Sequence, residues 1–310
     1  MKTIFDRVVT FFLCLGLLMI PCSASEAGLS PKETAIANDL ISHGYTTQAA
    51  YRLVKFDSIL KKMEAFGQKV DISPDGTVYI ENDSSGTNHL SNDEAEFIIT
   101  MLTEHIQQQA STCIAQEDAF QILAQDMEEN PGKSVYTVRT GENSFLRATV
   151  LITDSTIPSG NNEVSPASSG PVISGQYQFF NYGNKHISYE LEEVSDVYYA
   201  RCQIEALATS TAEKMTLTKP DSAQASIGLI SIQNASLNQK QTVATEVGDY
   251  CEISNNVVFA ISGSAGVNLL KGLISISISG GDNWTQKAII RAHKTSAYGI
   301  VWTLGDVYKI

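Results

Sequence analysis

The feature that most constrains the fold of this chain is a series of short alternations of apolar and polar residues after Pro131. A period of two places apolar side chains on one face of a strand and polar side chains on the other. Gly, Asn, Ser and Pro, which favour turns, divide the runs, and residues 155–171 have the composition of a flexible loop. We expect strands at 135–139, 146–153, 172–180, 186–192, 197–206, 226–232, 256–261, 273–279, 288–293 and 298–304. Strands at this spacing favour an antiparallel, sandwich-like fold.

The chain before Pro131 shows the signals of helices instead. Residues 30–33 form a capping box, with Pro at the first helical position, and apolar residues then repeat at helical spacing until Gly44. A second stretch with the same spacing runs over 46–67 and also ends at a glycine. These patterns predict two helices joined by a tight turn.

A short β-hairpin is expected after the second helix. Alternating apolar residues over 69–81 flank a Ser-Pro-Asp-Gly sequence, which favours a turn. A second capping box at 91–94 begins another helical pattern, which continues to the Pro131-Gly132 pair as either one long helix or two. The predicted fold class is therefore α+β: a helical N-terminal module with one β-hairpin over residues 28–130, then an antiparallel β-rich, sandwich-like C-terminal module over residues 131–310.

The first 27 residues resemble an export signal. A short basic segment precedes an uncharged run at 8–20, and Pro21 and several small residues follow it. This order is typical of a secretory signal peptide, cleaved here after Ala24, Ser25 or Ala27. The run is shorter than the roughly 20 apolar residues that span a bilayer. We therefore expect the mature protein to be secreted or extracellular.

The cysteines fit an exported protein with few cross-links. Lipidation at Cys22 is disfavoured, because Pro21 stands where a small residue is needed. Removal of the signal leaves Cys113, Cys202 and Cys251, too few for a disulfide framework. Cys202 and Cys251 both lie in strand-like segments, so a bridge between them is one alternative in an oxidising compartment. Isolated, buried thiols are the other.

Charge and motifs exclude several function classes. The chain holds 21 Lys and Arg against 34 Asp and Glu, a formal net charge of -13. This acidic balance disfavours nucleic acid and anionic membranes as partners. No pair of histidines has metal-ligand spacing, and no nucleotide-binding or nucleophile motif occurs, so we expect no metal, no cofactor and, on balance, no catalysis. The histidines are His43, His89, His105, His186 and His293.

Aromatic residues offer one candidate binding surface. Four of them gather within six residues, at Tyr177, Phe179, Phe180 and Tyr182. Exposed aromatic side chains on a β scaffold can stack on sugars or anchor a protein partner. Half-buried packing in a sheet is the alternative explanation. The leading hypothesis is an exported, non-enzymatic protein that binds an extracellular protein or glycan.

A secreted hydrolase is the first alternative to a binding protein. Its catalytic pair would be two carboxylates brought together by the β-rich module, although sequence alone does not place any two at the required separation. A solvated acidic surface explains the same residues. The acidic residues considered are Glu117, Asp118, Asp126, Glu128, Glu129, Glu190, Glu192 and Glu193.

A pore-forming protein is the second alternative. Residues 256–280 show aliphatic residues alternating with small polar ones in two arms, the pattern of a barrel strand with one lipid-facing side. Val267, Leu269 and Leu270 would form the membrane tip of this hairpin. A hairpin of a soluble sandwich, with its apolar face inward, shows the same alternation. A membrane partner is expected only under this alternative.

Overall fold

The computed structural model describes residues 29–73, 77–81, 88–112, 116–130, 133–141, 144–154, 176–179, 183–263, 283–294 and 300–304. The expected signal peptide, the loop at 155–171 and the membrane-tip residues Val267, Leu269 and Leu270 lie outside these ranges. The chain divides into two compact units, residues 1–55 and 56–310. This division does not coincide with the change in sequence pattern at Pro131.

The first unit contains α2 (Pro31–Ser42) and the beginning of α3 (Thr47–Ala65). The predicted capping box is present: Glu33 N donates to Ser30 Oγ at 3.3 Å, and Ser30 N donates to Glu33 Oε2 at 2.7 Å. Gly44, at φ +91°, ends α2, and Tyr45 N donates to Leu40 O at 3.1 Å. Both helices predicted from the sequence are therefore confirmed.

The second unit begins with the rest of α3, a small hairpin and two further helices. Strands β1 (Lys69–Ile72) and β2 (Val78–Glu81) pair antiparallel, as predicted. The other helices are α4 (Asn92–Thr112) and α5 (Gln116–Glu129), so the long helical pattern divides into two helices. Ser91 and Glu94 form the second capping box. Among the described residues, none of the helices is both long and apolar enough to span a bilayer.

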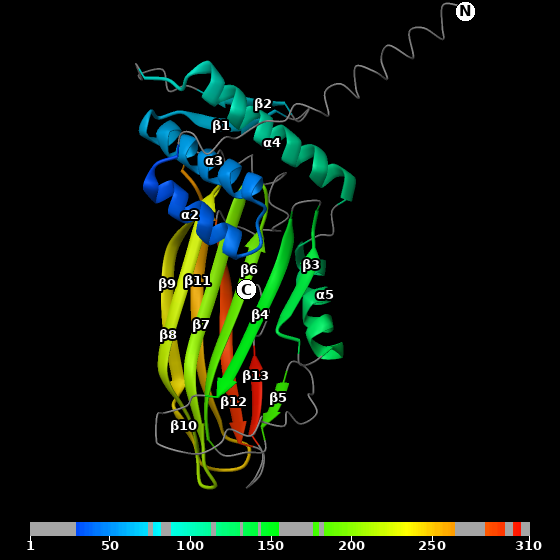
Figure 1. The fold of residues 1–310 in the computed structure, drawn as a ribbon, viewed down its shortest axis with the longest axis vertical. Coiled ribbons are helices and arrows are strands. Elements are labelled where there is room, and N and C mark those ends of the chain that lie inside the picture. Colours follow the sequence, from blue (N-terminus) through cyan, green and yellow to red (C-terminus); the bar gives the residue numbers. More distant parts are fainter. Residues whose placement is uncertain are drawn as a thin grey trace, which may run out of the picture. The chain divides into compact units, whose positions relative to one another are not determined.

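The rest of the second unit consists of two antiparallel sheets (Figure 1). In the described chain the larger sheet has six strands, ordered β10-β8-β7-β6-β4-β3. They are β3 (Val135–Arg139), β4 (Phe145–Asp154), β6 (Gly183–Val194), β7 (Tyr198–Ser210), β8 (Met215–Gly228) and β10 (Val243–Ala244). The other sheet has five, ordered β5-β13-β12-β11-β9. They are β5 (Gln176–Phe179), β9 (Ile230–Gln241), β11 (Tyr250–Ile261), β12 (Asn283–Lys294) and β13 (Ile300–Leu304).

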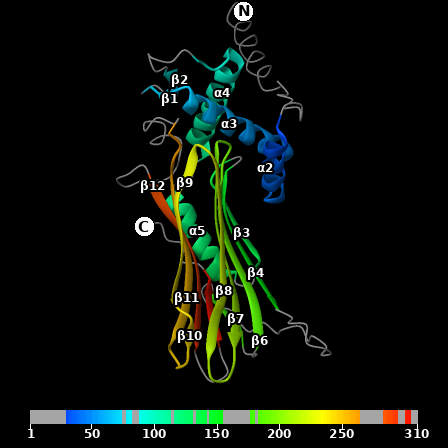
Figure 2. The same cartoon turned by 90° about the vertical axis from the view of Figure 1, so that its left-hand side faces the viewer.

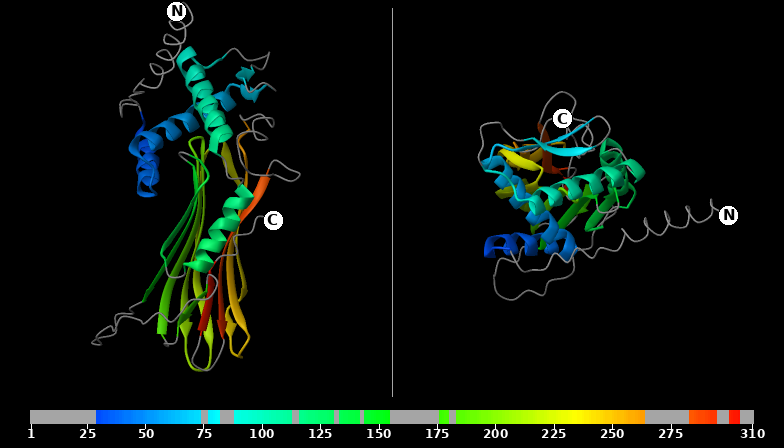
Figure 3. Two further views of the ribbon diagram at one scale, coloured as in Figure 1. Left: turned by 90° about the vertical axis from the view of Figure 1, so that its right-hand side faces the viewer. Right: turned by 90° about the horizontal axis from the view of Figure 1, so that it is seen from above.

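The two sheets form two layers, as Figure 2 shows. Alternate residues face the core: the even-numbered residues of β7 and β12, and the odd-numbered residues of β11 from Cys251 to Phe259, are buried. Hydrogen bonds join the layers directly, and in one of them Asn255 Nδ2 on β11 donates to Gln203 O on β7 at 2.9 Å. Helix α5 contacts β3 and β4 (Figure 3). The predicted α+β class, with a sandwich-like second part, is confirmed.

The strand predicted at 226–232 is wrong. These residues contain the end of β8, a turn and the start of β9. Gly228 has φ +82°, and a Cβ added to it would lie 2.2 Å from Val197 O, so the chain must turn at this glycine. The apolar residues on both sides of Gly228 gave the appearance of one strand. The actual strands β8 and β9 are rich in Ser, Asn and Gln and lack a strong alternation.

Of the hairpin proposed for residues 256–280, only the first arm lies within the described part of the chain. Its first arm belongs to β11, where Val257 pairs with Ala235 of β9 on one side and Gln286 of β12 on the other. Val257 and Phe259 are fully buried in the sandwich core. Because both edges of this arm are occupied, it has no edge for the second arm, whose residues lie outside the described part of the chain. The first arm therefore has its apolar face inward in the sandwich, and the pore-forming alternative stays a prediction.

Candidate functional site

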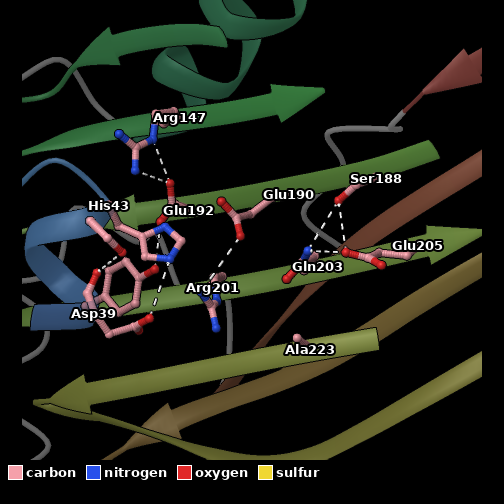
Figure 4. Close-up of polar contacts among 12 residues, drawn as sticks. Asp39, His43, Arg147, Ser188, Glu190, Glu192, Arg201, Gln203, Glu205 and Ala223 are labelled. Atoms are coloured by element: carbon pink, nitrogen blue, oxygen red, sulfur yellow. Dashed lines mark hydrogen bonds and ion pairs between the residues drawn. The ribbon is translucent and has the colours of Figure 1, made fainter. Parts of the chain in front are cut away.

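The outer face of the six-stranded sheet carries a ladder of polar side chains. Strand register places Glu192 of β6 directly between Arg147 of β4 and Arg201 of β7. Two residues earlier on β6, Glu190 lies opposite Gln203, and the next outward residue, Ser188, lies opposite Glu205. Residues that are directly or diagonally opposite on one face are close enough to interact. Figure 4 shows the resulting contacts.

The part of this ladder toward the C-terminal end of β6 is called the arginine cluster here. It consists of Arg147, Glu190, Glu192, Tyr199 and Arg201. Arg147 forms an ion pair with Glu192 Oε2 through both Nε, at 2.6 Å, and its terminal nitrogen. Tyr199 Oη donates to the other carboxylate oxygen at 2.6 Å. Burial raises the pKa of the Tyr199 hydroxyl far above its usual value, and the charge of Glu192 adds to the effect. Arg201 lies 3.9 Å from Glu190 Oε2.

This cluster has one feature expected of a glycosidase. An oxygen of Glu190 and an oxygen of Glu192 lie within 4.8 Å of each other, near the roughly 5–5.5 Å separation of retaining enzymes. However, Glu192 has an exposed fraction of 0%, and both of its oxygens accept hydrogen bonds from protein donors. A nucleophile or general acid must reach substrate, so we interpret Glu192 as a structural anion.

The part of the ladder toward the N-terminal end of β6 is called the Gln203 cluster. It consists of His186, Ser188, Gln203 and Glu205. Gln203 Nε2 donates to Ser188 Oγ at 3.2 Å and to Glu205 Oε1 at 2.9 Å. His186 Nε2 lies 3.3 Å from Glu205 Oε2. The side chains of His186 and Glu205 are 42% and 34% exposed. These polar groups are therefore oriented by one another on rigid strands and remain accessible to solvent.

Aliphatic side chains flank the Gln203 cluster on the same face. Leu151 of β4 lies directly opposite Ser188 and is 50% exposed. On the other side of β6, Leu207 of β7 lies opposite His186 and is partly exposed. An exposed leucine alone needs no functional explanation. Here, however, it adds an apolar contact beside a preoriented polar group.

A second carboxylate is buried inside the sandwich. Glu193 of β6 accepts a hydrogen bond from Tyr198 Oη at 2.7 Å and another from Gln286 Nε2 of β12 at 3.0 Å. The first bond lies within one sheet, and the second connects the two sheets. The hydrogen bonds compensate for burying the carboxylate, so Glu193 holds the layers together rather than binding an external molecule.

Cys202 and Cys251 are free thiols, so the bridge considered from the sequence is not formed. Cys202 lies on β7 of one sheet and Cys251 on β11 of the other. Cys202 Sγ contacts Asn255 O at 3.5 Å, whereas Cys251 Sγ contacts Met215 O at 3.4 Å. Burial raises the pKa of Cys202 to about 12 and that of Cys251 to about 11. Both therefore stay protonated and unreactive at neutral pH.

The aromatic binding candidates are only partly described. Tyr177 and Phe179 belong to β5, the edge strand of the five-stranded sheet, and pair with Trp302 and Ile300 of β13. The positions of their side chains, and the whole of Phe180 and Tyr182, lie outside the described part of the chain. Their role in binding stays a prediction.

The sequence identified some residues of the polar ladder, but it did not predict which of them lie opposite one another on neighbouring strands. Glu190, Glu192 and His186 stood out by residue type, whereas Ser188, Gln203 and Leu151 did not. The signal that could have found them is the polar alternation along β6 and β7, read together with the turn at 195–197 that joins these strands.

Comparison with known proteins assigns neither a family nor a function to this chain. The chain matches no protein-family model, no curated protein and no solved structure. The functional argument therefore depends on the geometry of the chain itself.

Proposed function

We propose that this chain is an exported, non-catalytic binding protein whose ligand contacts the Gln203 cluster. The observation that carries the proposal is the fixed, half-exposed hydrogen-bond array of Ser188, Gln203 and Glu205 on two adjacent strands. Polar groups that are already oriented lose little conformational entropy when they bind a ligand. A site on strands also keeps its geometry better than a site on loops.

The state of the carboxylates favours binding over hydrolysis. Glu192 is engaged by Arg147 and Tyr199, and Glu193 by Tyr198 and Gln286. On the outer face of the five-stranded sheet, Arg291 holds Glu252 through two nitrogens, at 2.8 and 2.7 Å. Carboxylates held in this way are poor general acids or bases, because their charge is already compensated and access to them is restricted.

Export is supported by the N-terminal pattern of a basic segment, an uncharged run and small residues. N-terminal sequencing of the protein recovered from the medium or the cell envelope would test it. We expect the mature chain to begin after Ala24, Ser25 or Ala27. A chain that retains Met1 in the soluble cell fraction would contradict export without affecting the binding site.

The binding function is tested with the mature protein on glycan and extracellular-protein arrays, together with turnover assays on glycoside and ester substrates. We expect at least one array signal and no turnover. The signal should fall in the double variant Gln203→Ala/Glu205→Ala. A matched control is Ser231→Ala/Gln233→Ala, which removes a similar Gln–Ser hydrogen bond of 3.2 Å from β9. Turnover that Glu190→Gln or Glu192→Gln abolishes would overturn the proposal in favour of a hydrolase.

A further inference from the structure

The hydrogen bonds inside the Gln203 cluster use its amide donors and leave acceptor oxygens available for a ligand. Both hydrogens of the Gln203 amide nitrogen are used, one on Ser188 Oγ and one on Glu205 Oε1. The hydroxyl of Ser188 lies 3.5 Å from the same Glu205 oxygen. The carbonyl oxygen of the Gln203 amide takes part in none of these bonds, and the Glu205 carboxylate has more lone pairs than these partners fill. A molecule that binds here must supply hydrogen-bond donors.

The surroundings of these acceptors are apolar on one side. Leu151, 50% exposed, lies directly opposite Ser188 on the same face of the sheet. Opposed residues on adjacent strands have Cβ atoms about 4.5–5.5 Å apart, so one small ligand can contact both. The site therefore suits a molecule with hydroxyl groups at its edge and C–H groups on its face.

Charge narrows the ligand class further. A formal net charge of -13 repels anionic ligands at long range. The Glu205 carboxylate is the obvious attraction for a cation, but Gln203 and His186 already contact both of its oxygens. Because these contacts occupy part of the hydrogen-bonding capacity of both oxygens, we take the ligand to be a neutral donor, and the salt dependence of binding tests that choice.

We propose that the Gln203 cluster together with Leu151 binds a neutral, polyhydroxylated ligand, which is the chemistry of an uncharged glycan. Hydroxyl groups of one sugar residue donate to Gln203 Oε1 and Glu205, and the C–H face of the ring lies on Leu151. This assignment rests on the proposed function, since it names the ligand class of the same site.

The test is calorimetric titration of the mature protein with neutral oligosaccharides of glucose, xylose, mannose and N-acetylglucosamine, at low and high salt. At least one should bind, with a Kd that changes little between 50 and 500 mM salt, about the range over which exposed charge pairs are screened. Gln203→Ala and Glu205→Ala should each weaken binding by about tenfold, the loss of one good hydrogen bond. Glu205→Gln keeps an acceptor oxygen and should cost about threefold or less, whereas Leu151→Asp should abolish binding.

The outcomes distinguish failure of the proposed ligand class, a neutral glycan, from failure of the proposed binding function of the Gln203 cluster. Absence of binding to every oligosaccharide, with cluster-dependent binding to a protein on the array, overturns the ligand class and leaves the proposed function standing. Binding of Lys-rich peptides that weakens with salt and with Glu205→Gln overturns it in favour of a cationic ligand. Oligosaccharide binding that is equal in Gln203→Ala, Leu151→Asp and the Ser231→Ala/Gln233→Ala control shows that the site is elsewhere. Circular dichroism and thermal unfolding confirm that each variant is folded.

Discussion

Glu192 is a charged residue with no exposed surface, and its stability depends on two partners from neighbouring strands. Arg147 compensates the charge at one carboxylate oxygen, and Tyr199 Oη donates a hydrogen bond to the other. Burial raises the pKa of Tyr199, and the negative charge of Glu192 raises it further, because a phenolate there would place two negative charges side by side. The buried Glu192 carboxylate is therefore held by both Arg147 and Tyr199.

Removal of Arg147 should destabilise the protein strongly. Arg147→Met keeps most of the volume but removes the arginine that pairs with the buried Glu192 carboxylate, a change that typically costs about 3–5 kcal/mol. Urea unfolding of the two proteins measures the difference. Lys240→Met is the control, because Lys240 is exposed and lies 3.9 Å from Glu252, and it should cost less than about 1 kcal/mol. Equal losses in the two variants would contradict the role of Arg147.

His293 should make stability depend on pH. Burial and the nearby Arg291 lower the pKa of this imidazole, while Glu252 opposes the effect, and its ring lies 5.5 Å from that of Tyr250. A lowered pKa means that the unfolded chain takes up a proton before the folded chain does. Stability from this group is therefore present above the unfolded pKa, about 6.5, and is lost as pH falls through the folded value.

Thermal unfolding between pH 5 and 8 measures this dependence. His293→Phe keeps a ring beside Tyr250 but cannot take up a proton, so its unfolding free energy should fall less than that of the natural chain between pH 7 and pH 5. Parallel curves for the two proteins would show that His293 does not contribute.

At the scale of elements, the turn between β8 and β9 fixes the position of several segments. Gly228 N donates to Asp57 Oδ1 of α3 at 3.0 Å, and Lys61 Nζ lies 2.5 Å from the other oxygen of that carboxylate. The next residue, Leu229, donates its N–H to Val197 O at 3.0 Å. One turn therefore connects a helix to two hairpins of the second unit.

Gly228→Ala should break this connection. The residue has φ +82°, and its new Cβ would lie 2.2 Å from Val197 O, so the backbone must move. Gly248→Ala is a matched control, because Gly248 has φ +98° but no atom within 4 Å of an added Cβ. The control should lose about 1–2 kcal/mol for the backbone conformation alone. Gly228→Ala should lose clearly more in the same urea titration, and a smaller loss than in the control would refute the steric argument.

The elements that sequence predicted well are those with strong local signals. Both capping boxes and the turn at Gly44 set helix ends, and β3 has the predicted boundaries, because alternation in VYTVR is unambiguous. The prediction missed β8 and β9 for a physical reason. Their outward and edge positions carry Ser, Asn and Gln, which give little alternation in the sequence. The few apolar residues at the junction of the two strands therefore dominated the sequence pattern and were interpreted as one strand.

The candidate site was harder to predict than the fold, because it depends on register. Gln203 and Ser188 are ordinary polar residues until the β6–β7 pairing places them diagonally on one face. The alternation shows which residues share a face, but a shift of the pairing by two residues would give different partners with the same alternation. Only the three-dimensional pairing distinguishes the Gln203 cluster from a solvated strand surface.

At the scale of the whole molecule, we propose that the second unit, a two-layered β-sandwich, presents a ligand site on one outer face. The interior polar residues, Glu193 and Asn255, connect the two sheets. The arginine cluster holds β4, β6 and β7 together beside the site. A rigid scaffold of this kind favours recognition by preoriented groups rather than by conformational change.

The most direct test of this account is a binding isotherm for one ligand, the strongest from the arrays, measured on three forms of the mature protein. We expect Gln203→Ala/Glu205→Ala to weaken binding by about tenfold or more, roughly the loss of one or two hydrogen bonds. We also expect Ser231→Ala/Gln233→Ala on β9 to bind as the natural chain does. Equal affinity in all three proteins, with each variant folded, would contradict the assignment of the Gln203 cluster as the ligand site.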